Sequence, residues 1–167
     1  KQNQTFSDLV NKVQEKFENI NPGEVTGIPS SLDTINKAIG GWQNSDLIIV
    51  AGRPGMGKTA FMVQQIVDAV KQNIPTGVFS LEMSAEQITG RVITNYTGIP
   101  NSSILRKGLK YDEIEKFAYL KKELLSLKIY IDDTPGISIQ NLRIKAKMLK
   151  LKYNIGIMFV DYLQLAT

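Results

Sequence analysis

From Ser31 onward, the sequence alternates short apolar runs with longer segments of helical periodicity. Strands separated by helices form a parallel sheet with helices on its faces. The runs Ile-Ile-Val, Val-Phe-Ser-Leu and Ile-Met-Phe-Val lack polar alternation, as in strands covered on both faces. The sequence therefore predicts an α/β fold with a mainly parallel sheet flanked by helices. We expect strands at residues 47–51, 76–81, 128–132 and 155–160, and helices at 32–39, 58–72, 84–96, 111–127 and 138–153.

The first 20 residues predict a separate amphipathic helix. Its apolar side chains fall on one stripe, formed by Phe6, Leu9, Val10, Val13, Phe17 and Ile20. Residues 21–30 carry two glycines and two prolines and predict a connecting loop, which leaves residues 31–167 as the main domain. The stripe packs either on its own domain or on another chain, and the pattern alone does not choose between these two arrangements.

Composition narrows the possible chemistry. The chain has no cysteine and no histidine, so disulfide frameworks, thiolate zinc sites and imidazole catalysis are excluded. The net charge of +4 argues only weakly for a polyanionic partner. No apolar run could cross a bilayer, and the first residues lack the apolar core of a signal peptide. We expect a cytoplasmic protein without a membrane partner.

The stretch from Gly52 to Thr59 has the form GxxxxGKT, between a predicted strand and a predicted helix. Glycines let successive backbone N–H groups turn toward phosphate oxygens at the positive end of the helix. Lys58 would neutralise the β and γ phosphates, and the Thr59 hydroxyl would bind Mg²⁺. The motif lies between a predicted strand and a predicted helix, as a phosphate-binding loop requires, so a chance glycine-rich turn is disfavoured. We expect a nucleoside triphosphate to bind here. The predicted nucleotide-binding residues are Gly52, Arg53, Pro54, Gly55, Met56, Gly57, Lys58, Thr59 and Ala60.

Carboxylates at strand ends are candidates for the rest of the site. Asp161 ends a predicted strand and could associate with the metal, or could merely cap that strand. Asp132 and Asp133 also end a strand, but we expect them to cap the Thr-Pro-Gly turn that follows. Glu82 is the candidate to orient or deprotonate the attacking water, with a role at the start of the next helix as the alternative.

Two basic features allow more than one interpretation. Helix 138–153 carries Arg143 and four lysines on one side and no acid, which suits either nucleic acid phosphates or a solvated surface. Arg91 is an isolated arginine in the helix at 84–96, a pattern typical of a solvated side chain.

Five phrases together resemble the ATPase motor domain of the DnaB-type replicative DNA helicases, over residues 26–165. They are TGIPSSLDTINKAIGGW, DLIIVAGRPGMGKTAF, GVFSLEMSAEQ, IYIDDTPGIS and IMFVDYLQL, in that order. The resemblance implies a RecA-like P-loop NTPase that binds ATP and Mg²⁺, encloses single-stranded DNA as a homo-hexamer and drives unwinding.

The resemblance also assigns roles to particular residues. Lys58 and Thr59 match the phosphate and magnesium residues of the family, Glu82 its catalytic glutamate, and Asp161 its second magnesium-associated acid. Arg91 falls where the family has an arginine that approaches the nucleotide. The first helix corresponds to a linker that docks on the adjacent subunit.

The chain departs from the family pattern in two respects. Position 55 is glycine where many relatives have serine, which should leave phosphate binding intact. The family's DNA-contacting loops, γ-phosphate sensor, arginine finger and N-terminal primase-binding domain have no counterpart here, so we expect a truncated fragment whose isolated form can be inactive. Primase and a helicase loader would bind parts of the parent protein outside this chain. A RecA-like recombination or helicase-loading ATPase and a small-molecule phosphotransferase remain alternative functions.

Overall fold

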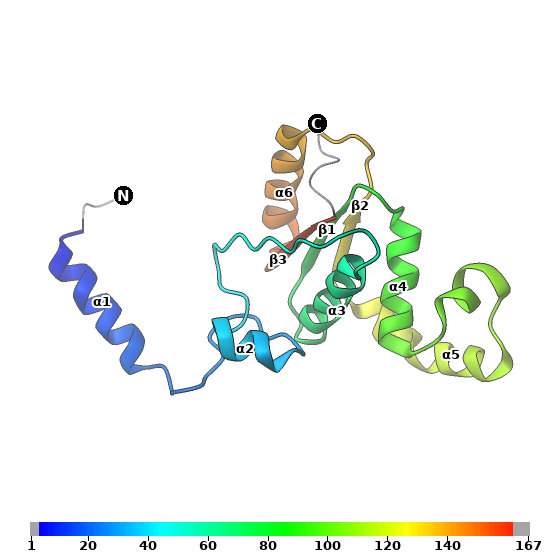
Figure 1. Cartoon of the computed structure of the whole chain (residues 1–167), viewed down its shortest axis with the longest axis horizontal. Coiled ribbons are helices and arrows are strands. Elements are labelled where there is room, and N and C mark those ends of the chain that lie inside the picture. The colour runs from blue at the N-terminus through cyan, green and yellow to red at the C-terminus, as the bar shows by residue number, and fades with distance from the viewer. Residues whose placement is uncertain (1–3, 162–167) are drawn as a thin grey trace. The chain divides into compact units, whose positions relative to one another are not determined.

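The computed structural model describes residues 4–161 of the chain. These residues form two compact units, one ending at Ile48 and the other beginning at Ile49 (Figure 1). The first unit contains two short helices and their connections, whereas the second contains the sheet. Among the described residues, none of the helices combines the length and apolar character needed to span a membrane.

In the first unit, α1 (Phe6–Glu18) is the predicted amphipathic helix. A capping box between Thr5 and Asp8 sets its start, because each side chain binds the other's backbone N–H. Helix α2 (Asp33–Ile39) ends at Gly40, whose φ of 69° is the left-handed conformation that glycine adopts without strain. All six apolar side chains of the predicted stripe are exposed, from 38% at Ile20 to 82% at Phe6.

The second unit is built on a three-stranded sheet in the order β2-β1-β3. Strand β1 (Thr76–Ser80) lies in the centre and pairs in parallel with β2 (Ile129–Asp132) and β3 (Ile157–Asp161). All five residues of β1 are buried, as expected for a strand covered on both faces. The predicted parallel sheet is therefore confirmed.

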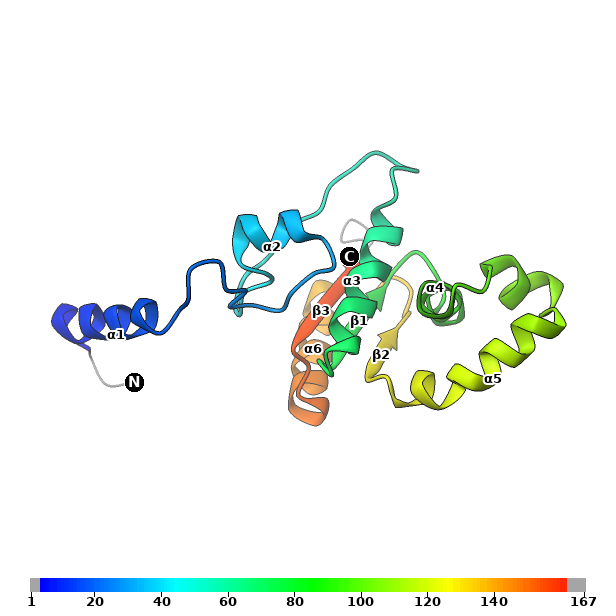
Figure 2. The same ribbon diagram turned by 90° about the horizontal axis from the view of Figure 1, so that it is seen from below.

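Helices cover both faces of this sheet (Figures 1 and 2). Helices α3 (Lys58–Lys71) and α4 (Ala85–Thr97) pack together on one face, and α6 (Ile139–Tyr153) lies on the other. The short π-helix η1 (Ser103–Lys107) and α5 (Tyr111–Ser126) connect α4 to β2. The main core lies between the sheet and helices α3 and α4, and it consists of Met62, Val63, Ile66, Val67, Val78, Ile88 and Val92.

Two local predictions were wrong or incomplete. Residues 47–51 do not form the expected strand, and the apolar side chains from Leu47 to Val50 are exposed. A strand is stabilised by hydrogen bonds to a neighbour, and an apolar run does not specify whether a neighbour is present. The π-helix η1 was also missed, because its single turn is too short to show periodicity.

Candidate active site

The glycine-rich loop leads directly into the first turn of α3. Gly55 and Gly57 have φ values of 79° and 89°, with open space where a Cβ would stand. The Met56 N–H donates to the Arg53 carbonyl at 3.2 Å, which closes a turn within the loop. Gly57 is the N-cap residue of α3 and provides no side-chain hydrogen bond, and the first turn of the helix contains no acid. The first N–H groups of a helix have no carbonyl partner within it and attract anions, so this helix start suits a phosphate group.

Thr59 and Asp161 meet beside this loop. They are 102 residues apart in the chain, yet the Thr59 hydroxyl donates to Oδ2 of Asp161 at 2.9 Å. Thr59 lies in the first turn of α3, whereas Asp161 is the last residue of β3 and is 7% exposed. Hydroxyl and carboxylate oxygens are hard donors, so this pair fits Mg²⁺. The contact also shows that Asp161 does more than cap its own strand.

No ready-made metal cage exists elsewhere in the part of the chain described. Residues 4–161 contain no group of three or more acidic side chains that could hold a metal ion. A magnesium ion between Thr59 and Asp161 would therefore take its remaining ligands from water and from the phosphates, which is the usual pattern for this metal.

Glu82 lies in the short turn between β1 and α4. The turn begins next to Asp161, because the Leu81 N–H donates to the Asp161 carbonyl at 2.7 Å. Glu82 itself is exposed. The alternative role, stabilising the start of α4, falls to Ser84 and Gln87, which form a complete capping box. Glu82 thus lies at the carboxyl edge of the sheet, close in the chain to a residue bonded to Asp161, without serving as the cap.

The two acids after β2 have different partners. Asp132 accepts from the Thr134 N–H at 3.0 Å, as predicted for a turn, and forms a 2.6 Å ion pair with Lys145. Burial raises the pKa of the Asp132 carboxyl, but the hydrogen bonds from Lys145 and Thr134 together lower it by more. The turn-capping prediction was wrong for Asp133, which instead accepts from the Ala85 N–H at 2.7 Å, 48 residues away in the chain.

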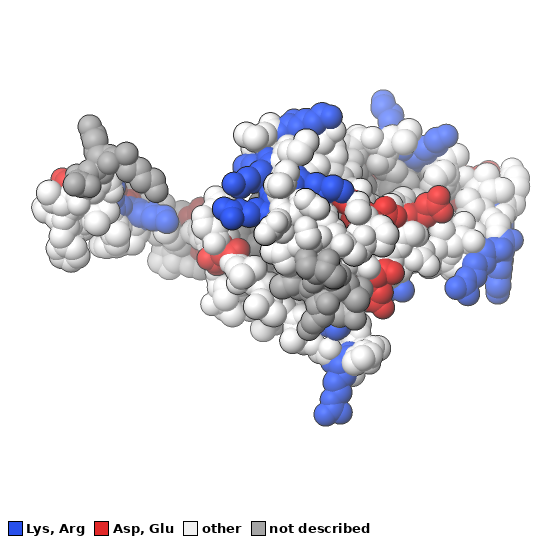
Figure 3. Space-filling model, turned by 90° about the horizontal axis from the view of Figure 1, so that it is seen from above, with Lys and Arg blue, Asp and Glu red and all other residues white. Residues whose placement is uncertain are grey.

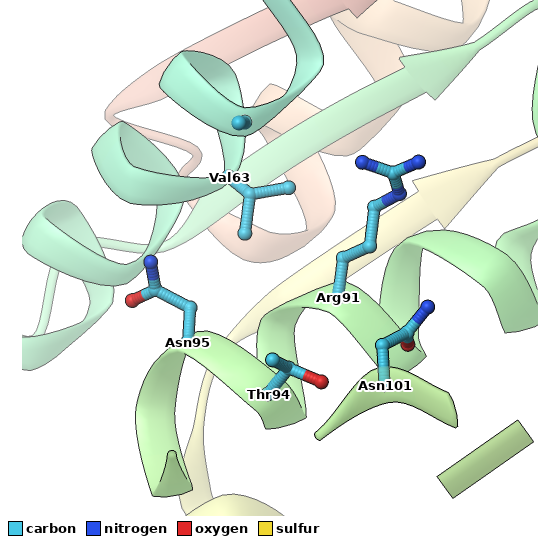
Figure 4. Close-up of a pocket in the computed structure, with 6 residues that line it drawn as sticks. Val63, Arg91, Thr94, Asn95 and Asn101 are labelled. Carbon is cyan, nitrogen blue, oxygen red and sulfur yellow. The ribbon is translucent and has the colours of Figure 1, made fainter. Parts of the chain in front are cut away.

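A pocket of about 340 Å³ opens between α3 and α4 (Figure 4). Arg91 and Thr94 line it from α4, Ala60 and Val63 from α3, and Asn101 from the segment before η1. The lining also includes Asn95. Within residues 4–161, Arg91 Nε, Thr94 Oγ1 and Asn101 Oδ1 are buried without a hydrogen-bond partner.

Sequence reasoning found only one of these polar groups. The resemblance pointed to Arg91, and the helical spacing of three residues could have added Thr94 on the same face. Asn101 carried no signal, because it follows the end of α4 and reaches the pocket only through the path of the chain. Buried polar atoms without partners are costly, so a pocket lined by three of them favours a polar ligand.

The outer face of α6 is basic, and Lys and Arg side chains gather there in Figure 3. Arg143, Lys147 and Lys152 are exposed. Lys150 is also exposed but donates to the side chain of Asn154 and to the Ile155 carbonyl at the end of its own helix. These exposed cations are compatible with the predicted contact with nucleic acid phosphates.

Comparison with known proteins shows which family the sequence matches. Residues 27–167 match the model of the DnaB-like helicase C-terminal domain. The chain is 39% identical to the replicative DNA helicase DnaB of Rickettsia conorii over 96% of its length, but covers 36% of that protein. It is 38% identical to DnaB of Geobacillus stearothermophilus over 96% of its length, covering 37% of that relative. The chain thus spans little more than a third of these relatives.

Solved structures agree with the sequence relatives. The ATPase domain of G40P matches 99% of this chain with a TM-score of 0.89 and 25% identity, and the chain covers 60% of it. A DnaB-like replicative helicase, studied with its primase interactions, matches 98% with a TM-score of 0.87 and 26% identity. The chain covers 41% of that structure. These neighbours confirm the predicted RecA-like fold. By sequence and by structure, therefore, the chain belongs to the DnaB-like helicase C-terminal domain family.

Proposed function

We propose that this chain is the ATP-binding part of the motor of a replicative helicase that unwinds duplex DNA at the fork. The hydrogen bond between Thr59 and Asp161 carries the proposal. It joins the end of the glycine-rich loop to a strand-end carboxylate, which is the pairing that magnesium-dependent NTP hydrolysis requires. Family membership supports the same activity.

The residues of the loop would hold the triphosphate. Backbone N–H groups between Gly52 and Ala60 donate to phosphate oxygens, and the Lys58 ammonium neutralises charge on the β and γ phosphates. Thr59 and Asp161 would hold Mg²⁺, Asp161 through water. When bound, the ion supplies positive charge that stabilises the departing phosphate oxygen.

Glu82 would act on the attacking water. Its carboxylate accepts a proton from the water as the water oxygen bonds to the γ phosphorus. The bond from that phosphorus to the β–γ bridging oxygen breaks, and ADP leaves with the electron pair. No histidine is present in the chain to take this role.

We further propose that Arg91 and its pocket hold the base end of the nucleotide. The pocket includes Ala60, the last residue of the predicted phosphate-binding stretch, and the unpartnered polar atoms of the pocket suit a heterocycle with donors and acceptors. Replacing Arg91 by methionine should weaken ADP binding about tenfold, the cost of a lost hydrogen bond to a charged group. Calorimetry should show no change for tripolyphosphate, which has no base.

The matched control for this experiment is Arg106→Met, which removes an exposed arginine in η1. Its ADP affinity should equal that of the parent. An equal loss of tripolyphosphate affinity in Arg91→Met would place Arg91 at the phosphates and contradict the base pocket.

Helix α1 would dock on the neighbouring subunit of a homo-hexamer. Within the described residues, none of its side chains is buried, and Val13 is 60% exposed at the middle of the stripe. Val13→Asp should break the full-length ring into smaller species in sedimentation velocity, because a charge in an apolar interface is costly. Asn11→Asp, on the opposite face, should leave the ring intact. Identical sedimentation of both variants would exclude α1 from assembly.

The remaining partners follow from the family. We propose that the ring encloses single-stranded DNA in the cytoplasm, and that primase and a loader bind parts of the protein outside this chain. A primase interaction is described for one solved relative. The DNA-contacting and arginine-finger residues would also lie outside residues 1–167. Residues 162–167, which include the Tyr-Leu-Gln-Leu part of the family phrase, lie outside the described residues.

The deciding experiment is strand displacement on a forked duplex by the full-length protein with ATP and Mg²⁺. We expect unwinding, together with stimulation of ATP hydrolysis by single-stranded DNA. Hydrolysis with DNA stimulation but no unwinding would instead favour a recombination or loading ATPase. Phosphate transfer to a small acceptor, unaffected by DNA, would indicate a phosphotransferase and reject the proposal.

A further inference from the structure

The turn that carries Glu82 is held at both ends by specific hydrogen bonds. At its start, the buried hydroxyl of Ser80 donates to the Met83 carbonyl at 2.6 Å. At its end, Oδ2 of Asp133 accepts from the Ala85 N–H at 2.7 Å. Ala85 is the first residue of α4. Glu82 thus lies between two anchored points only a few residues apart.

The hydrogen bond between Asp133 and Ala85 connects the loops that follow two neighbouring strands, β2 and β1. Asp132 pairs with Phe79 in the β1–β2 register, so the loops after both strands emerge side by side. The first N–H groups of a helix have no carbonyl partner within it. Ser84 satisfies one of them, at Gln87, and Asp133 satisfies another. A carboxylate at this end is also favoured by the helix dipole.

The residues on either side of Asp133 are fixed to α6. The Lys145 ammonium donates to Asp132 Oδ2 at 2.6 Å and to the Thr134 hydroxyl at 2.8 Å. Asp132 also accepts from the Thr134 N–H. Asp133 is exposed, but these bonds hold the backbone that carries it. A continuous set of contacts therefore runs from α6 through the loop after β2 to the start of α4.

We propose that Asp133 is a positioning residue for Glu82. The Glu82 side chain is exposed, so the placement of its carboxylate depends on the backbone of the turn that carries it. Fixing Ala85 restricts that turn, and a small displacement of a catalytic group is costly to the rate. The inference rests on the proposed role of Glu82 in hydrolysis.

Steady-state ATP hydrolysis by full-length variants, with single-stranded DNA present, tests this role. Asp133→Ala should lower kcat about tenfold, since the turn is loosened rather than removed. KM for ATP and the calorimetric Kd for ADP should stay within about twofold, because the phosphate loop is untouched. Asp133→Asn keeps an acceptor oxygen and should retain kcat within about threefold. Hydrogen exchange at the Ala85 amide should accelerate in Asp133→Ala only.

The control is Asp112→Ala, which removes another exposed aspartate from the first turn of a helix, α5. Its kcat should match the parent. Unchanged kcat in Asp133→Ala would overturn the proposal. A fall in kcat accompanied by a similar loss of ADP affinity would also overturn it, because it would indicate general destabilisation. An equally large fall in kcat in Asp133→Asn would overturn it as well, because it would indicate an effect of charge. Failure of the proposed function appears separately, as parental turnover in Glu82→Gln.

Discussion

Replacing Lys58 by alanine in the full-length protein is expected to lower ATP turnover by about 10²–10³-fold, as when an enzyme loses one group that stabilises transition-state charge. Lys58 begins α3, directly after the glycine whose φ is 89°. Its ammonium would balance charge on the β and γ phosphates while the transferred group departs. The measurement is phosphate release under saturating ATP and Mg²⁺.

The fold should survive this substitution. Lys58 is half-buried, and alanine is a strong helix former, so the circular dichroism spectrum should be retained. Lys121→Ala, an exposed position in α5, is the control and should hydrolyse ATP at the parental rate. A folded Lys58→Ala protein with parental turnover would show that the glycine-rich loop is not the catalytic phosphate site.

Replacing Glu82 by glutamine should leave ATP bound but lower its hydrolysis by about 10²–10⁴-fold, the range for loss of a positioned general base. The amide keeps the size of the side chain and cannot accept the proton of the attacking water. Because Glu82 is exposed and α4 is capped by Ser84, the substitution should not affect folding. Single-turnover hydrolysis and nucleotide retention on a filter measure the two effects separately.

Glu86→Gln provides the comparison for this variant, since Glu86 is an exposed glutamate in the first turn of α4, four residues after Glu82. It should bind and hydrolyse ATP normally. If Glu82→Gln lost nucleotide binding together with turnover, Glu82 would be a structural residue of the site and another group would have to activate the water.

Most of the fold could be predicted from local patterns. Helices α3, α4, α5 and α6 begin and end within two residues of their predicted bounds, because their apolar periodicity spans three or more turns. The three observed strands were also predicted, since each is a short apolar run between turn residues. The expected strand at 47–51 was wrong, because an apolar run reports a tendency to be buried and not a hydrogen-bonded neighbour.

The residues of the candidate site could likewise be predicted only in part. Motif spacing alone singled out Lys58 and Thr59, since the loop that binds phosphate is contiguous in the chain. Asp161 was predicted from its place at a strand end, but its contact with Thr59 depends on β3 lying within reach of the start of α3. Asp133 was assigned to the wrong partner, because its nearest polar groups in the chain are not its nearest in space.

By itself, the sequence determined most of the element types, the phosphate-binding loop and the family resemblance, because these depend on periodicity and on residues adjacent in the chain. Only the tertiary structure decided which strand ends meet. It brought Asp161 within hydrogen-bond distance of Thr59, and Asp133 within hydrogen-bond distance of Ala85. It also brought Arg91, Thr94 and Asn101 together around one pocket. The physical reason is that hydrogen bonds act over about 3 Å, and side chains far apart in the chain come that close only through strand order and helix packing.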